Sequence, residues 1–124
     1  MSDQLLPACP VETTLQLISN RWKVLILRDL LTGTKRFGEL KKSLQGVSQK
    51  VLTANLKEMA QDGLLIRTSY PEVPPRVEYT LTPMGESLRP VLAAMFDWGT
   101  VYKAEMGQPN TPLADQLGTI LHRV

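Results

Sequence analysis

Residues 37–65 read FGELKKSLQGVSQKVLTANLKEMAQDGLL, and this stretch decides the fold. Apolar residues at helical spacing predict a short helix over 37–44. The residues QGV at 45–47 interrupt it, and Ser48 is suited to cap a second helix that ends at Gly63. Two helices joined by three or four residues, often with a glycine, form a helix-turn-helix. The sequence therefore predicts this motif here.

The second predicted helix has an apolar face and a polar outer face. The apolar face, which should pack on a core, carries Leu52, Leu56 and Met59. The outer face carries two cations, a hydroxyl and a methyl group, from Lys50, Thr53, Ala54 and Lys57. A helix that enters the major groove of DNA needs small or donor-bearing side chains of this kind, and Ser48 and Gln49 would lie at its leading end. The alternative is an ordinary solvent-exposed face.

A β-hairpin is predicted directly after this helix, because the apolar residues change to a spacing of two. The two strands lie near residues 64–67 and 77–81, and the loop over 70–76 contains Pro74 and Pro75. A hairpin after a helix-turn-helix is the wing of a winged helix. Arg76 follows the two prolines, and an arginine at such a tip suits a narrow minor groove. The alternative is a stiff hairpin with a solvated arginine.

Helices are also predicted on both sides of this central unit. One begins at Pro10, and the next is capped by Asn20 and ended by Gly33. After the hairpin, Thr82 and Pro83 should begin a long helix, which Pro90 should kink. We therefore expect an α+β, mainly α fold: a winged helix-turn-helix with a two-stranded β wing and N- and C-terminal dimerisation helices.

The chain divides into three predicted segments. Residues 1–8 form an N-terminal extension, residues 9–107 the winged helix-turn-helix domain, and residues 108–124 a C-terminal tail with a short helix. The apolar side of that last helix would carry Leu113, Leu117, Ile120 and Leu121.

Positive charge is concentrated in one part of the chain. Residues 21–57 hold nine Lys and Arg against two acidic residues, a balance of +7, whereas the whole chain carries only +2. A basic block in a nearly neutral chain is typical of a surface that faces phosphates. The alternative is a solvated helix face that is basic by chance.

Composition argues against several other classes. There is no apolar run long enough to cross a bilayer and no secretory signal at the N-terminus, so we expect a cytoplasmic protein with no membrane partner. One cysteine leaves no multi-cysteine metal cluster, and the single His122 has no carboxylate cluster near it in sequence. We expect no enzyme activity, no metal and no cofactor.

The chain resembles the HxlR-type winged-helix regulators, which are close to the MarR-type regulators. The resemblance covers residues 9–107 and rests on several motifs: CPV at 9–11, RFGEL at 36–40, SQKVLTANLKEMAQDGLL at 48–65, PPRVEY at 74–79 and WG at 98–99. It implies a homodimer that binds a double-stranded DNA operator and controls transcription, often as a repressor and in response to small molecules or electrophiles. The DNA-contacting residues would be Arg36, Ser48, Gln49, Lys50, Thr53, Ala54, Lys57 and Arg76.

The predicted long helix has apolar residues on more than one face, so a second copy should cover part of it. We expect the dimer interface to include Val11, Leu15, Val91, Leu92, Met95, Trp98 and Tyr102. An alternative function from another class is a winged helix that binds only proteins, without an operator.

Cys9 stands just before Pro10, at a predicted helix N-terminus, where the helix dipole favours a thiolate. The resemblance implies that a cysteine at this position senses redox or electrophile signals, in some members through a disulfide between subunits. The alternative is a small residue packed at the dimer interface without a redox role.

Overall fold

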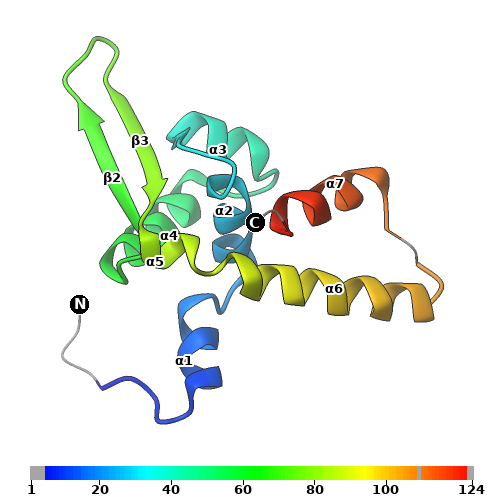
Figure 1. Ribbon diagram of the computed structural model, residues 1–124. Coiled ribbons are helices and arrows are strands. Elements are labelled where there is room, and N and C mark those ends of the chain that lie inside the picture. Colours follow the sequence, from blue (N-terminus) through cyan, green and yellow to red (C-terminus); the bar gives the residue numbers. More distant parts are fainter. Residues whose placement is uncertain (1–4, 109, 123–124) are drawn as a thin grey trace.

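The computed structural model describes residues 5–108 and 110–122. Its elements, labelled in Figure 1, are α1 (Pro10–Leu17), α2 (Arg21–Leu30), β1 (Lys35–Arg36), α3 (Phe37–Ser43), α4 (Gln49–Gln61), β2 (Leu65–Tyr70), β3 (Arg76–Leu81), α5 (Pro83–Glu86), α6 (Arg89–Glu105) and α7 (Pro112–Leu121). Helices α2, α3 and α4 form the body, the β2–β3 hairpin projects from it, and α6 extends away from it (Figure 1). Among the described residues, no helix has the length and apolar character that crossing a membrane requires.

The helix-turn-helix is confirmed, and its ends are set by short-range contacts. The side chain of Ser48 accepts a hydrogen bond from the backbone N–H of Val51 at 3.1 Å, which caps α4. Asn20 caps α2 in the same way, accepting from the backbone N–H of Lys23 at 3.0 Å. Gly46 in the turn has a φ of 90°, a backbone conformation that residues with a Cβ rarely adopt. The local sequence therefore determines where these helices begin and turn.

The two-stranded wing is confirmed, and a third short strand, β1, which the sequence does not predict, joins it in one sheet. Its order is β1-β3-β2 and both pairings are antiparallel, with Lys35 opposite Tyr79 and Arg67 opposite the same tyrosine from the other side. The two residues of β1 are too few to show an alternating pattern. Beside this pairing, the hydroxyls of Thr34 and Thr80 lie 2.8 Å apart. The extra strand fixes the base of the hairpin to the start of α3.

The long C-terminal helix is broken rather than kinked. Thr82 caps α5 as predicted, but α5 ends at Glu86 and α6 begins at Arg89. Pro90 lies in the first turn of α6, where its missing N–H costs nothing. In a continuous helix the same proline would have lacked a bond to the carbonyl of Glu86. The prediction of one kinked helix is therefore wrong.

One hydrophobic core packs against the inner side of the helix-turn-helix. It lies between α2, α3, α4 and the sheet, and its most buried side chains are Ile26, Leu27, Leu30, Leu40, Leu44, Leu52, Leu56, Met59, Leu64 and Leu65. The predicted inward face of α4 thus packs on α2. Because these apolar contacts fill the inner side of α4, its outer side is left for solvent or a partner.

Helix α7 folds back beside α6 (Figure 1). The guanidinium of Arg89 donates to the carbonyl of Ile120 at 2.7 Å and to that of Leu31 at 3.1 Å, so it joins the ends of α7 and α2. At the far end of the pair, the side chain of Asn110 donates to the hydroxyl of Thr100 at 2.8 Å. One side of α6 is therefore covered within the protomer.

Candidate nucleic-acid interface

The outer face of α4 carries the residues that the sequence placed there. Its exposed side chains are Gln49, Lys50, Thr53, Ala54 and Lys57. Ser48, at the start of this helix, is exposed, but its oxygen is used in capping. A surface of ammonium, amide, hydroxyl and methyl groups offers both hydrogen-bond donors and apolar contacts to base edges.

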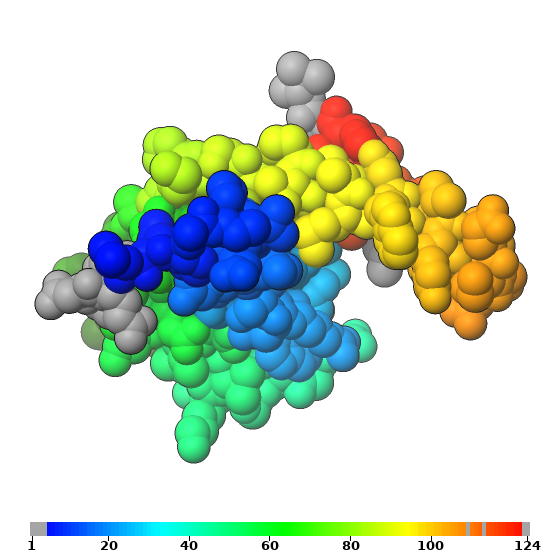
Figure 2. Space-filling view, turned by 90° about the horizontal axis from the view of Figure 1, so that it is seen from below, coloured from blue at the N-terminus to red at the C-terminus, as the bar shows by residue number. Residues whose placement is uncertain are grey.

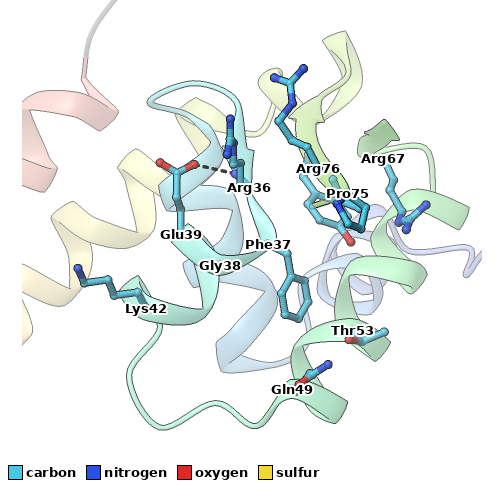
Figure 3. Close-up of a pocket in the computed structure, with 12 residues that line it drawn as sticks. Arg36, Phe37, Gly38, Glu39, Lys42, Gln49, Thr53, Arg67, Pro75 and Arg76 are labelled. Atoms are coloured by element: carbon cyan, nitrogen blue, oxygen red, sulfur yellow. Dashed lines mark hydrogen bonds between the residues drawn. The ribbon is translucent and has the colours of Figure 1, made fainter. Parts of the chain in front are cut away.

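A cleft of about 670 Å³ lies between α3, α4 and the wing (Figure 3). Its lining comes from all three elements: Arg36, Phe37, Gly38, Glu39, Lys42, Gln49, Thr53, Arg67, Pro75, Arg76, Val77 and Tyr79. In Figure 3 the amide of Gln49 and the hydroxyl of Thr53 lie at the α4 end. Arg36 and Arg76 extend toward the opposite end, and Phe37 lies between them and α4. The cleft therefore joins the outer face of α4 to the wing.

Arg76 is held in place by its neighbours on the wing. Its guanidinium donates to Glu72 at 2.9 Å and to Glu78 at 2.8 Å, and it lies 3.9 Å from the centre of the Tyr70 ring. Partial burial lowers the pKa of Arg76, but the hydrogen bond and charge of Glu72 and the charge of Glu78 outweigh it and raise this pKa above its ordinary value. Arg76 therefore stays charged and ordered, and two carboxylates lie beside it.

Arg36 stands at the junction of β1 and α3. Its backbone N–H donates to Oε1 of Glu39 at 2.7 Å, which satisfies an otherwise free donor at the start of α3 (Figure 3). The side chain of Arg36 is exposed at the cleft. The guanidinium of Arg36 therefore lies at the cleft, while the carboxylate of Glu39 caps the helix.

The cations around this cleft differ from those behind it. Within residues 5–108 and 110–122, no carboxylate lies within salt-bridge distance of Lys35, Arg36, Lys41, Lys42, Lys50, Lys57 or Arg67. Lys23 and Arg28, from the same basic block, are paired with Glu58 and Asp29. Seven of the nine cations without such a partner in the described residues thus lie on β1, α3, α4 and β2, and the other two are Arg21 on α2 and Lys103 on α6.

The sequence prediction missed two cations of the cleft, Lys42 and Arg67. Lys42 belongs to the basic block, which was the signal that could have identified it. Arg67 lies outside that block on β2, and only the antiparallel pairing with β3 brings it to the cleft. In Figure 3 these two residues lie on opposite sides of the site.

The predicted dimer residues fall into an exposed group and a buried one. Val11 and Leu15 on α1 are exposed, and so are Met95, Trp98 and Tyr102 on α6. The rings of Trp98 and Tyr102 are stacked with their centres 5.2 Å apart, and Trp98 is 69% exposed. Figure 2 shows α1 in blue and α6 in yellow on one face of the molecule, with the end of α6 projecting beyond the body.

Two of the predicted dimer residues, Leu92 and Val91, pack against the protomer's own core. Leu92 is only 4% exposed and packs in the protomer's own core, so it does not belong to the free face. Its position on α6 turns it toward the body, which an apolar sequence pattern alone does not reveal. Val91 is partly buried against the same core.

Cys9 lies at the start of α1, and its side chain is exposed. Its carbonyl accepts a hydrogen bond from the backbone N–H of Thr13 at 3.1 Å, which begins the helix. The thiol is thus accessible beside the exposed Val11, on the helix predicted to lie at the dimer interface.

Comparison with known proteins gives a consistent result. The model of the family described as HxlR-like helix-turn-helix matches residues 17–106. The chain is 47% identical to the HTH-type transcriptional regulator YdeP of Bacillus subtilis over 95 residues, which are 77% of this chain and 74% of that protein. It is 48% identical to the HTH-type transcriptional regulator YtfH of Escherichia coli over 90 residues, 73% of this chain and 71% of that protein.

Solved structures with the same architecture include two regulators of related sequence. The reduced form of the redox regulator HypR matches with a TM-score of 0.75 and 36% identity, over 80% of this chain and 98% of that one. The reduced form of the transcriptional regulator YodB from B. subtilis matches with a TM-score of 0.66 and 39% identity, over 74% of this chain and 91% of that one.

Proposed function

The chain belongs to the HxlR-like helix-turn-helix family of transcriptional regulators, and from this premise we propose that it is a homodimer that binds a specific double-stranded DNA operator. The observation that carries the proposal is the gathering of unpaired cations around the cleft between α4 and the wing. Such a surface fits a phosphate backbone that passes between two contacted grooves. A protein of this function works where the chromosome lies, so we also propose that it acts in the cytoplasm.

Helix α4 is the recognition helix of this proposal. Its 13 residues span about 20 Å. The residues of its outer face are all basic or uncharged: Lys50, Thr53, Ala54 and Lys57. The first turns of a recognition helix usually reach the base edges. Gln49, Lys50 and Thr53 would therefore read bases, and Lys57 at the later turn would meet a phosphate.

The wing would contact the neighbouring minor groove through Arg76. Its pairing with Glu72 and Glu78 fixes the side chain before DNA arrives, which lowers the entropy cost of binding. The same two carboxylates reduce the net charge of the wing tip. We therefore assign the contact with the DNA phosphates near the wing to Arg67, which has no carboxylate partner within the described residues.

The homodimer would form through the exposed apolar residues of α1 and α6. Met95, Trp98 and Tyr102 lie three or four residues apart and so make a stripe along α6. This stripe stays uncovered although α7 packs on α6, so a second copy of α6 is its natural partner. The two recognition helices would then lie about 34 Å apart, one turn of DNA.

A binding titration tests the proposal. The duplexes are the region upstream of the protein's own gene and a scrambled duplex of equal length, each measured by fluorescence anisotropy at several salt concentrations. We expect tighter binding to the upstream region and a linear fall of log affinity with log salt for both. Equal, salt-independent binding would contradict the proposal and favour a winged helix that binds only proteins.

Lys57→Ala should reduce the slope of log affinity against log salt by about one unit, because each phosphate contact releases about one counterion. The loss should be the same for the upstream and scrambled duplexes, since a phosphate carries no sequence information. Lys103→Ala is the matched control, because it removes an exposed cation of α6 far from the cleft. An unchanged slope in Lys57→Ala would remove this residue from the interface.

The redox response is proposed on Cys9. The similarity to a solved redox regulator and the exposed thiol at the start of α1 support it. Diamide would accept two hydrogens from the Cys9 thiols of two copies, leaving a disulfide between them. The resulting shift of α1 would change the spacing of the recognition helices, and a displacement of about 1–2 Å is the usual scale.

Cys9→Ser should therefore bind the operator like the parent but keep binding after diamide treatment. The parent should lose affinity and regain it with dithiothreitol. The measurement is anisotropy on the operator duplex together with a non-reducing gel. If Cys9→Ser loses binding on treatment as the parent does, Cys9 is not the sensor.

A further inference from the structure

The strongest unexplained feature is a group of polar side chains between α2 and the recognition helix. Lys23 on α2 and Asn55 on α4 are 4% and 7% exposed, and they are the buried polar or charged residues of the described chain. Together with Asn20 and Glu58 they form what we name the α2–α4 clasp. We infer that this clasp sets the rotation of α4 about its own axis, so that Asn20 and Asn55 are positioning residues for DNA recognition.

Two hydrogen bonds of the clasp join the N-terminal turn of α2 to one side of α4, and two more hold the asparagine side chains against the backbone of their own helices. The amide nitrogen of Asn20 donates to Oδ1 of Asn55 at 2.9 Å, while its oxygen caps α2. The amide nitrogen of Asn55 donates to the carbonyl of Val51 at 2.9 Å. The ammonium of Lys23 donates to Oε1 of Glu58 at 2.6 Å. Asn55 thus has both ends of its side chain occupied.

Apolar packing alone does not fix the rotation of α4 tightly. Leu52, Leu56 and Met59 hold the helix against the core, but contacts of this kind have little directional preference. Hydrogen bonds depend on angle as well as distance, and a buried amide left without a partner is costly. Rotation of α4 would break the hydrogen bond that the oxygen of Asn55 accepts from Asn20.

The clasp lies on the side of α4 that is turned away from the cleft. Successive residues of a helix differ by about 100°, so Val51, Asn55 and Glu58 share one flank, while Gln49 and Thr53 lie on the other. Any rotation that moves Asn55 from Asn20 moves Thr53 relative to the wing. This inference rests on the proposed function, because it takes α4 to be the helix that reads DNA.

Asn20→Ser is the decisive variant. Serine caps a helix about as well as asparagine, so α2 keeps its cap, but serine is too short to reach Asn55. We expect the ratio of affinities for operator and scrambled duplex to fall about tenfold, with the scrambled affinity nearly unchanged. Asn20→Asp, which keeps the size and the cap but lacks the donor, should lower the ratio in the same direction.

Asn110→Ser is the matched control, since it removes a side-chain hydrogen bond between α6 and the segment that leads into α7, far from α4. Both serine variants should lower the melting temperature slightly, but only Asn20→Ser should change the affinity ratio. If Asn20→Ser has a lower melting temperature but an unchanged ratio of operator to scrambled affinity, the clasp is merely structural and the inference is overturned.

Residual dipolar couplings of the backbone amides separate this inference from the proposed function. They give the orientation of α4 relative to α2 without DNA, and we expect it to differ between the parent and Asn20→Ser but not between the parent and Asn110→Ser. If the parent shows no preference for any duplex, the proposed function fails and these couplings alone decide whether the clasp orients α4. Unchanged couplings in Asn20→Ser would overturn the clasp even where DNA binding is specific.

Discussion

Trp98→Asp is expected to give a monomer whose affinity for the operator is about 100-fold lower than that of the parent. Trp98 is among the most exposed large apolar side chains of α6, stacked on Tyr102 in the stripe proposed to meet a second copy. A carboxylate in a desolvated interface is strongly unfavourable. A dimer places two recognition helices on one duplex, and loss of the second contact removes a gain of about 10²–10⁴ in affinity.

Sedimentation velocity and anisotropy on the same samples measure both parts of this prediction. Because Trp98 lies on the surface of the protomer, the variant should keep its circular dichroism spectrum and fold as a monomer. Trp98→Phe is the control, since it keeps an aromatic apolar group and should remain dimeric. A dimeric Trp98→Asp with parent-like affinity would mean that the copies meet elsewhere or that binding needs only one copy.

Gly85→Ala should destabilise the protein by about 3 kcal/mol, a fall in melting temperature of roughly 10 °C. An added Cβ would clash with the carbonyl oxygen of Leu64 and lie 3.1 Å from a methyl carbon of Leu81. The Leu64 carbonyl cannot move freely, because it accepts a hydrogen bond from the backbone N–H of Thr82 at 3.0 Å. The clash therefore separates α5 from the junction of α4 and β2.

Gly38→Ala is the control for this change, because an added Cβ there meets nothing within 4 Å. This position lies in α3, where alanine is favoured over glycine by about 0.5–1 kcal/mol, so the melting temperature should stay the same or rise slightly. Thermal unfolding followed by circular dichroism compares the two variants. A Gly85→Ala protein as stable as Gly38→Ala would show that α5 is not packed against Leu64 as described.

The sequence by itself determined the helix-turn-helix, the hairpin and the basic outer face of α4. These features depend on residues within one or two turns of each other. Ser48 caps its own helix, Gly46 and Gly63 have the positive φ values of 90° and 78° that their turns require, and alternation marks the strands. Local hydrogen bonds and backbone preferences act at short range, so a single sequence is enough to predict them.

Only the tertiary structure decided how these parts face one another. The third strand β1, the place of Arg67 at the cleft and the burial of Leu92 were not predicted. Most of these depend on packing or pairing between segments that the chain separates widely.

The α2–α4 clasp is the clearest case, because Asn20 and Asn55 are 35 residues apart, the sequence marks Asn20 only as a helix cap, and no pattern marks Asn55. A buried amide must find a partner, but the sequence does not say which one, since that depends on how the core brings two helices together. Local chemistry therefore specified which helix carries the candidate recognition residues, and long-range packing specified the direction in which it presents them.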